Sequence, residues 1–297
     1  MTGCLPAFCS GEEFLAEVRT AAAARPDRLQ AWWVGQSGFL VAWAGRWLLF
    51  DPYLSDSLTR KYAATDRPHV RMTARVVDPA RLGGVSVVTA SHHHTDHLDP
   101  ETLRPLAEAN PGLVLVGPEA IRGLLRERSG LPDGRIVGLD ADGESDANWV
   151  EVGEGTFRFR AIPAAHEALD TDARGRALYL GFVVRAGPWT LYHAGDTVRY
   201  PGQVERLRRT PVDLAFLPIN GREASRRVSG NLWGREAAEL AQEAGIRCVV
   251  PCHYGMFTFN TAPPDEFVAR CGQLGQPHRV LQPGEGLAWR VGAPGPG

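Results

Sequence analysis

The feature that most constrains this chain is a histidine cluster that directly follows a short apolar run. Residues 85–100 read VSVVTASHHHTDHLDP, and the β-branched first part is typical of a buried strand. The second part fits the ligand pattern H-x-H-x-D-H, with candidate ligands at His92, His94, Asp96 and His97. Alternate residues at a strand end point to the same side, so the first two side chains can converge on one ion and the last two on a second.

Three further candidate ligands occur downstream, each just beyond a predicted strand. His166 follows the run TFRFRAIPAA, Asp196 lies in LYHAGDT, and His253 lies in VVPCHYG. Open α/β sites are normally built at strand ends, which favours one shared site over three coincidences. The alternative for the cluster is a histidine-rich surface loop that binds metal by accident. For each downstream residue alone, the alternative is a hydrogen-bonded histidine or a turn aspartate.

The seven side chains have a chemistry that suits two divalent ions. Five neutral imidazoles and two carboxylates give each ion three terminal ligands and a shared oxygen, and they leave open positions for water and substrate. Two adjacent ions lower the pKa of a bridging water and create a hydroxide nucleophile at neutral pH. We predict that Asp96 also holds this hydroxide by a hydrogen bond and moves its proton. The imidazole-rich set favours zinc, while manganese or iron fits the same residues.

The strand and helix patterns indicate an α/β fold. Residues 31–50 are interpreted as three short strands joined by glycine-containing turns. Ser10 and Glu13 form a capping-box pattern before an alanine-rich helix. Strands and helices recur in the second half, where a helix at 231–244 is stopped by Gly245. This order of elements predicts two sheets between two helix layers, a four-layer αββα sandwich.

Composition narrows the class of partner and the location. The chain has 297 residues and a formal net charge of -2, so it lacks the basic surplus of a nucleic-acid binder, and we expect a small-molecule substrate. Five cysteines without a C-x-x-C pair, and a start without a signal-peptide pattern, favour the cytoplasm. Polar residues and glycines interrupt the apolar stretch 31–50, so no membrane span is predicted. A homo-oligomer is compatible with these features.

On these motifs the sequence resembles the metallo-β-lactamase-fold hydrolases. The motifs follow the order of that superfamily, from Asp51 through the histidine cluster to His166, Asp196 and His253. The segments WWVGQSGF, FDPYLSD, LYHAGDT and VVPCHYG are most similar to the ascorbate-6-phosphate lactonase branch, to which N-acyl phosphatidylethanolamine phospholipase D is related. The resemblance is specific for the fold and the metal site and much less specific for the substrate. It implies a hydrolase domain at 31–290, preceded by a helical extension at 1–30 and followed by a disordered tail at 291–297.

The resemblance also implies a role for each candidate residue. One ion would be bound by His92, His94 and His166, the other by Asp96, His97 and His253, and Asp196 would bridge them. Asp51 would be a partner behind the ligands. His193 alternates away from Asp196 on its strand and is expected in a similar supporting position. The flavodiiron oxygen reductases of this superfamily have a glutamate where this chain has His94 and carry an added flavin domain, so hydrolysis is favoured over redox chemistry.

Two regions are expected to contact substrate. In this superfamily the loop GREASRRVSG at 221–230 borders the metal site, so Arg222, Arg226 and Arg227 are expected to bind an anionic group. Tyr254, Phe257 and Phe259 are expected to form an apolar wall, and the segment 55–81 is expected to act as a lid. The alternatives are a solvated basic loop and ordinary buried packing of the aromatic side chains.

The expected activity is a dinuclear, metal-dependent hydrolysis. A metal-bridging hydroxide would open a lactone or related ester of a small, anionic metabolite, and a phosphodiester is the alternative substrate because both reactions pass through an oxyanion that two cations stabilise. A third hypothesis is a metal-binding protein without catalysis, against which the complete set of seven ligands argues.

Overall fold

The computed structural model describes residues 4–23, 28–141 and 149–290, and the strands of these residues form two sheets. One sheet contains β1 (Arg28–Gly35), β2 (Gly38–Trp43), β3 (Arg46–Phe50), β4 (Val85–Thr89), β5 (Val114–Pro118), β6 (Ile136–Leu139) and β13 (Gly286–Arg290), in the order β13-β1-β2-β3-β4-β5-β6. The other contains β7 (Val150–Val152), β8 (Phe157–Pro163), β9 (Leu180–Ala186), β10 (Trp189–His193), β11 (Leu214–Pro218) and β12 (Cys248–Cys252), in the order β12-β11-β10-β9-β8-β7.

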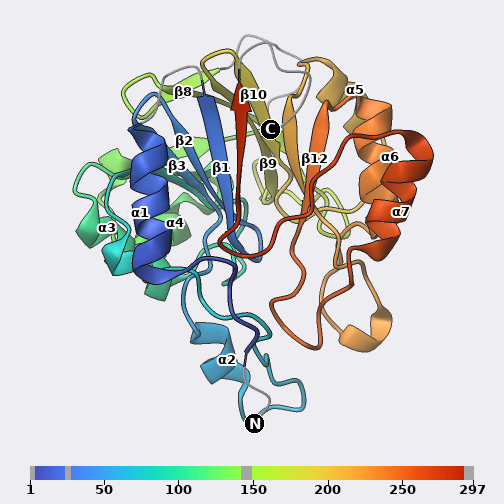
Figure 1. The fold of residues 1–297 in the computed structure, drawn as a ribbon, viewed down its shortest axis with the longest axis horizontal. Coiled ribbons are helices and arrows are strands. Elements are labelled where there is room, and N and C mark those ends of the chain that lie inside the picture. The colour runs from blue at the N-terminus through green and yellow to red at the C-terminus, as the bar shows by residue number, and fades with distance from the viewer. Residues whose placement is uncertain (1–3, 24–27, 142–148, 291–297) are drawn as a thin grey trace.

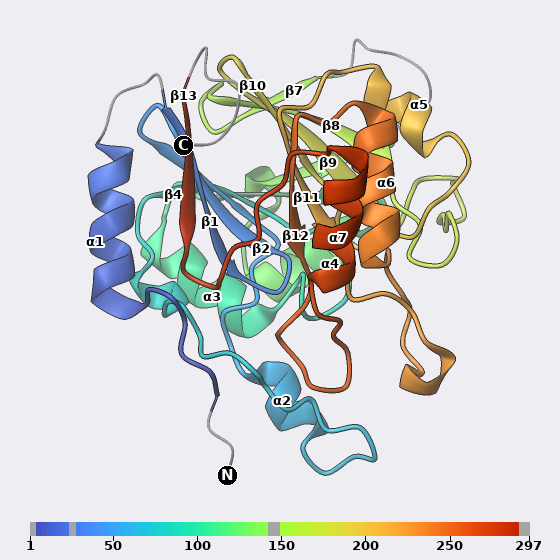
Figure 2. The same ribbon diagram turned by 45° about the vertical axis from the view of Figure 1, so that its right-hand side comes forward.

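Helices cover the outer face of each sheet, as the ribbon shows from two sides (Figure 1, Figure 2). The helices beside the first sheet are α1 (Gly11–Ala22), α3 (Pro100–Ala109) and α4 (Arg122–Ser129), and those beside the second are α5 (Gln203–Arg208), α6 (Gly234–Ala244) and α7 (Asp265–Leu274). A short helix, α2 (Ser57–Tyr62), lies at the lower end of the molecule in Figure 1. The predicted αββα sandwich is confirmed.

Three apolar layers hold this arrangement together. Between the two sheets, the rings of Phe39 on β2 and Phe216 on β11 stack with their centroids 3.9 Å apart, and both side chains are fully buried. A second cluster packs α1, α3 and α4 on the first sheet, and a third packs α6 and α7 on the second. Each buried aromatic side chain of this size removes a large apolar area from water, which is the main force that joins the layers.

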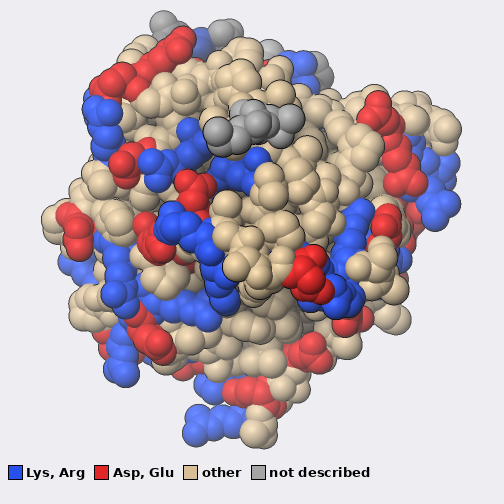
Figure 3. Space-filling view, turned by 90° about the horizontal axis from the view of Figure 1, so that it is seen from below, with Lys and Arg blue, Asp and Glu red and all other residues tan. Residues whose placement is uncertain are grey.

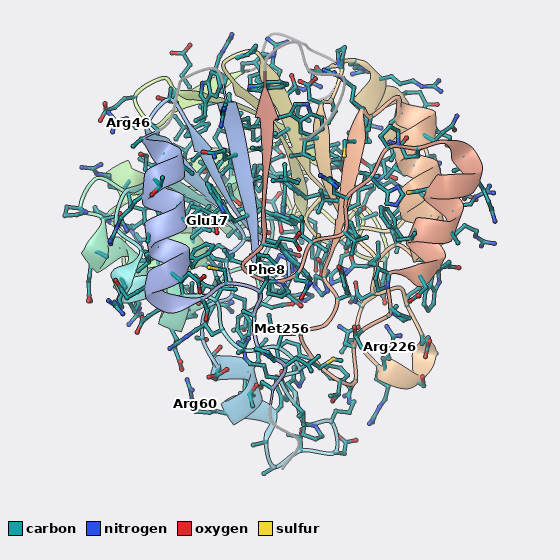
Figure 4. The ribbon with its side chains drawn as sticks, in the orientation of Figure 1. Phe8, Glu17, Arg46, Arg60, Arg226 and Met256 are labelled. Atoms are coloured by element: carbon teal, nitrogen blue, oxygen red, sulfur yellow. The ribbon has the colours of Figure 1, made fainter. Side chains whose placement is uncertain are left out.

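The first helix departs from its expected start. Ser10 stands at the N-cap position, but its side chain caps no backbone N–H, so the predicted capping box with Glu13 is wrong. The chain is fixed here by a tertiary contact, because the backbone N–H of Gly11 donates to the carbonyl of Val76 at 2.8 Å. The buried Trp32 of β1 donates from Nε1 to the carboxylate of the exposed Glu17 at 2.7 Å, and Glu17 is labelled in Figure 4.

Other boundaries agree with the sequence or shift slightly. The helix predicted at 231–244 begins at Gly234, where the Glu236 carboxylate accepts from the Trp233 N–H, and it ends before Gly245, whose φ is +72°. The segment 55–81, which is expected to act as a lid, contains α2. β1 begins at Arg28, inside the range 1–30 predicted as a helical extension, and the predicted tail 291–297 lies outside the described residues. No helix of the described residues has both the length and the apolarity needed to cross a membrane.

Strand direction brings the chemical motifs to one edge. β3 and β4 run parallel, as do β10, β11 and β12, and β8 shares the direction of β10 because both are antiparallel to β9. The carboxyl ends of these strands therefore lie at the same edge of their sheets. The histidine cluster follows β4, and the three downstream candidates follow β8, β10 and β12.

Candidate metal centre and substrate cavity

The seven candidate ligands meet at this edge in three overlapping groups. In each group the ligand atoms lie within 4.8 Å of one another, and the groups are His92 with His94 and His166, His92 with His97 and Asp196, and Asp96 with His97 and His253. The first and third groups are the same two triplets that the resemblance implies. The second group contains one member of each triplet together with Asp196, so it joins them.

Asp196 lies between the two triplets. Its Oδ1 is 3.2 Å from Nε2 of His97, and its Oδ2 is 3.1 Å from Nε2 of His253 and 3.5 Å from Nε2 of His166. The carboxylate thus presents one oxygen toward an imidazole of one triplet and the other oxygen toward imidazoles of both. A bridging carboxylate needs this position.

Several polar atoms at the centre lack a partner within the described residues and suit a bound metal ion. Nε2 of His92, Nε2 of His97 and Oδ1 of Asp196 are buried and make no hydrogen bond with the described residues. The His97 and Asp196 atoms are close enough to interact but lack hydrogen-bond geometry. Leaving buried polar atoms unsatisfied costs about 1–3 kcal/mol each, and imidazole nitrogen with carboxylate oxygen is the donor set that zinc and other transition metals bind.

A buried network behind the ligands sets the orientation of two imidazoles. Nδ1 of His97 lies 2.8 Å from Oδ2 of Asp51. The Ser91 hydroxyl donates to Asp51 and lies 3.0 Å from Nδ1 of His92, from which it can only accept, since its own proton is committed. With both Nδ1 protons held in this way, the Nε2 lone pairs of His92 and His97 face the centre, as metal ligation requires.

His166 is oriented from the opposite side. Its Nδ1 donates to the carbonyl oxygen of Gly230 at 3.0 Å, which also leaves its Nε2 lone pair for the centre. Gly230 lies in the connection between β11 and α6, so this connection contacts the candidate metal centre through its backbone. Arg222 and Arg226 of the same connection make other contacts.

Burial and the carboxylates of Asp96 and Asp196 shift the pKa values of the histidines in opposite directions. Burial lowers the pKa of His166 to about 4 and that of His92 well below its usual value, so both imidazoles are neutral at pH 7. Burial also opposes charge on His253 and His97, but Asp196 and Asp96 outweigh it. They raise the pKa of His253 to about 9 and that of His97 well above its usual value.

Gln36 is a member of the site that the sequence reasoning missed. It follows β1 in the turn to β2, and its Nε2 donates to Oδ2 of Asp96 at 2.8 Å. Its backbone carbonyl accepts from the N–H of His253 at 2.9 Å, and Gln36 and His253 both have positive φ, 50° and 61°. The topology signal was present, because Gln36 follows a strand that ends at the same edge as the ligands.

A cavity of about 460 Å³ opens over the ligand groups. His94, Asp96, His166, Asp196 and His253 contribute to its lining. Its other lining residues are His93 and Thr95 of the histidine cluster and residues from α2 and the segment after it, the end of α4, the loop 227–229 and the chain after His253. On the face seen from below the view of Figure 1, basic and acidic side chains alternate and form no continuous basic area (Figure 3).

Of the residues expected to contact substrate, Arg227, Phe257 and Phe259 line this cavity. Arg222, Arg226 and Tyr254 are not among its lining residues. Arg222 forms a two-pronged ion pair with Glu236, at 2.6 and 2.7 Å. Arg226 donates to the carbonyls of Asn220 and Thr261, which ties its loop to the chain after β12; Figure 4 labels it at the end of the molecule where α2 lies. Tyr254 stacks on Trp33 at 4.9 Å. The expected contacts are corrected accordingly, because these side chains are committed to the protein.

Three further residues, His193, His69 and Arg128, lie behind the centre or line the cavity. His193 is buried behind the centre, where its Nε2 donates to the Ser37 carbonyl at 2.8 Å and its ring stacks on Phe50. His69, for which the sequence offered no context, lines the cavity, and so does Arg128 from α4. No local sequence pattern predicts that either residue lines the cavity, because a single histidine in a loop and a single arginine on a helix are ordinary surface features.

Comparisons with known proteins show the family of this chain. Residues 46–254 match the family model described as a beta-lactamase superfamily domain. A protein of Opitutus terrae named "UPF0173 metal-dependent hydrolase" is 29% identical over 259 residues, which cover 84% of this chain and 96% of the relative.

Solved structures show the same fold. The metallo hydrolase Igni18 of Ignicoccus hospitalis has a TM-score of 0.65 at 20% identity, over 89% of this chain and 99% of its own. An isothiocyanate hydrolase from Delia radicum gut bacteria has a TM-score of 0.68 at 19% identity, over 88% of this chain and 99% of its own. At these identities the two structures show likeness of fold, and function has to come from the site. The chain belongs to the metallo-β-lactamase superfamily and is, like its relative from Opitutus terrae, a metal-dependent hydrolase.

Proposed function

We propose that the chain is a dinuclear hydrolase that opens a lactone or related ester of a small, anionic metabolite. Within the superfamily we assign it to the ascorbate-6-phosphate lactonase-like branch and expect it to act in the cytoplasm. The observation that carries the proposal is the position of Asp196 between two complete ligand triplets, with buried and unsatisfied nitrogen and oxygen atoms at their centre.

The chain's own residues would hold the two ions, with zinc as the first choice and manganese or iron as alternatives. His92, His94 and His166 would hold one ion, Asp96, His97 and His253 the other, and Asp196 would be shared. Two ions bound there would supply a hydroxide nucleophile at neutral pH and stabilise the oxyanion that forms on the attacked carbonyl.

The remaining roles belong to residues that orient and exchange protons. Asp51 fixes His97 through Nδ1, and the Gly230 carbonyl fixes His166 in the same way. Burial opposes charge on Asp96, yet His97 and His253 hold the pKa of Asp96 well below its usual value, so it is ionised at neutral pH. Gln36 occupies Oδ2 of Asp96, and we assign the other oxygen the task of accepting a hydrogen bond, and then the proton, from the attacking water.

Turnover assays with the metal-loaded protein test this function. A panel of lactones is compared with bis-p-nitrophenyl phosphate, and we expect preferential lactone opening. Preferential cleavage of the phosphodiester would instead favour the phosphodiesterase alternative. A protein that binds two metals and hydrolyses neither class would contradict the catalytic assignment and favour a non-catalytic metal-binding role.

Substitutions separate the site from the rest of the chain. His94→Ala and Asp196→Ala should each abolish metal-dependent turnover, because each removes a side chain from a ligand group. His278→Ala is the matched control, since His278 bonds to the Gln276 carbonyl and packs against Phe267 away from the cavity lining. Retained turnover in either ligand variant would overturn the ligand assignment.

A further inference from the structure

We propose that Arg128 binds an oxyanion group of the substrate, a carboxylate or a phosphate, and that four aromatic side chains of the cavity lining bind an apolar group of the same molecule. This inference rests on the proposed ester hydrolysis and names the class of substrate for it. It replaces the anion-binding role expected of Arg222 and Arg226.

Arg128 is fixed at the edge of the metal centre by the protein backbone. It lies in the last turn of α4, is half-buried and lines the cavity. Its Nη1 donates to the carbonyl of His93 at 2.6 Å and is 3.4 Å from that of Leu98. His93 precedes the ligand His94, so the guanidinium is held against the segment that carries the first ligand triplet.

The guanidinium has donors that the protein leaves unused. No carboxylate of the described residues lies within ion-pair distance of Arg128, and neither Nε nor Nη2 donates to another of these residues. A guanidinium has five N–H donors in a planar fork that matches a carboxylate or phosphate. A half-buried positive charge without a counter-ion at the wall of a cavity is therefore complementary to an anionic group placed inside it.

The other two basic residues of the cavity are in different situations. Arg227 forms an ion pair with Asp66, so its charge is already compensated. Lys61 is exposed, and its Nζ lies 5.1 Å above the ring of Tyr62. Of the three cations that line the cavity, Arg128 is thus the one that is both anchored and without a carboxylate partner in the part of the chain that the structure describes.

An aromatic wall forms another part of the cavity. We use this name for Tyr62, His69, Phe257 and Phe259, all of which line it. The His69 ring lies 4.1 Å from that of Tyr62, 5.1 Å from that of Phe257 and 4.4 Å from that of Phe259, measured between centroids. Phe257 and Phe259 follow the ligand His253 closely in sequence, so the wall adjoins the second ligand triplet while Arg128 adjoins the first.

This arrangement selects an amphipathic ester. The bond to be hydrolysed has to lie over the two triplets, which places an anionic group toward Arg128 and an apolar or aromatic group toward the wall. A cavity of about 460 Å³ fits a small molecule of this kind and falls within the usual range for ligand pockets. A neutral ester of the same shape would leave the Arg128 donors without a partner.

Matched synthetic esters test the inference. The anionic probe is mono-4-nitrophenyl adipate, and the neutral probe is its methyl ester, so the two share the aromatic leaving group and the chain length. The measured quantity is the ratio of kcat/KM for the anionic probe to kcat/KM for the neutral one. A third probe, 4-nitrophenyl 5-phosphonopentanoate, tells whether a phosphate-like group is preferred over a carboxylate.

Variants assign the preference to one side chain. Arg128→Gln should lower the ratio by roughly 10- to 100-fold, the usual range for a lost charge-assisted hydrogen bond, and Arg128→Lys should restore part of it. Arg126→Gln, an exposed change of the same charge on the same helix, should leave the ratio unchanged. Metal content measured on each variant separates loss of anion recognition from damage to the histidine segment.

The inference and the proposed function fail in different ways. An unchanged ratio in Arg128→Gln, with both probes still hydrolysed, would overturn the inference and leave the hydrolase intact. If the wild-type protein hydrolyses neither ester, binding of the non-hydrolysable N-(4-nitrophenyl)adipamic acid and of its methyl ester is measured by calorimetry. Tighter binding of the acid that is lost in Arg128→Gln would support the inference even then, and equal binding of the two compounds would overturn it.

Discussion

His97 Nδ1 lies 2.8 Å from Asp51 Oδ2, and both side chains are fully buried. Asp51 also accepts from the hydroxyls of Thr89 and Ser91 and from the backbone N–H of Ser91. The carboxylate is therefore held rigidly, and through it so is the direction in which Nε2 of His97 points. An aspartate that contacts no substrate thus fixes the geometry of the second ligand triplet.

Asp51→Asn should weaken metal binding while retaining most of the shape of the side chain. The amide is uncharged and cannot accept from the hydroxyls and the imidazole as a carboxylate does, and loss of such outer partners typically costs 10- to 100-fold in metal affinity. Calorimetric titration of the metal-free protein with zinc measures this change in affinity. Asp133→Asn, at an exposed ion pair with Arg122, serves as the control; wild-type affinity in Asp51→Asn would contradict the role given to Asp51.

Metal binding should release protons and strengthen as the pH rises. Without metal, Asp196 and Asp96 outweigh burial and raise the pKa of His253 to about 9 and that of His97 well above its usual value, so both imidazoles carry an extra proton at pH 7. A bound ion has to displace these protons, so its affinity falls as the pH falls. Calorimetric titration in buffers with different ionisation enthalpies counts the protons. Zinc binding without proton release at neutral pH would contradict the raised pKa values of His97 and His253.

Gly195 is required where the chain turns from β10 into Asp196. Its φ is +60°, and a Cβ there would lie 2.7 Å from the Ser91 Cβ and 2.8 Å from the Leu180 carbonyl oxygen. Gly195→Ala should therefore lower stability and displace the Asp196 carboxylate. Gly175→Ala, also at positive φ but with open space around the new Cβ, should cost only the roughly 1–2 kcal/mol of the backbone conformation. Thermal unfolding and zinc stoichiometry of both variants check this; equal behaviour would contradict the argument.

Arg67 links the two segments that border the cavity entrance. Its Nη1 donates to the carbonyls of Arg226 and Arg227, at 2.7 and 2.8 Å, which joins the segment after α2 to the loop before α6. Arg67→Ala should lower the stabilisation that these hydrogen bonds give by about 1–2 kcal/mol. If the segment 55–81 acts as a lid, the variant should also raise KM more than it changes kcat. Faster hydrogen exchange in both segments is the structural readout.

Arg60 offers a matched control for that experiment. It lies on α2, where it pairs with Glu101 on the outside of the molecule, and Figure 4 labels it there. Arg60→Ala should leave exchange in the loop before α6 unchanged. Unaltered exchange in Arg67→Ala would show that the two segments are held in place by other contacts.

The sequence predicts the parts of this molecule that depend on local pattern and strand direction. The β-branched run before His92 and the alternation of strands and helices lead to the αββα sandwich, because each pattern fixes an element whose apolar face must be covered. The convergence of His166, Asp196 and His253 follows from the rule that parallel strands end at one edge. Each of these predictions uses only a local pattern and the direction of the strand beside it.

Contacts between distant segments could not be predicted in this way. Arg222 and Arg226 have the composition of an anion-binding loop, yet Glu236 and two backbone carbonyls engage them. Arg128 shows the reverse case. Its sequence context is that of a solvated helix residue, yet it lines the cavity. Which arginine is left without a carboxylate depends on tertiary packing, and no local pattern encodes it.

The account's central claim is that two ions share Asp196, and the metal content of the purified protein tests it most directly. Mass spectrometry on the wild-type protein and on Asp196→Ala, each after reconstitution with zinc, gives the number of ions per chain. We predict about two ions per wild-type chain and a clear loss of zinc from Asp196→Ala, with Asp133→Ala unchanged. A wild-type chain that holds no stoichiometric metal, or an Asp196→Ala chain that keeps the full content, would contradict the dinuclear centre.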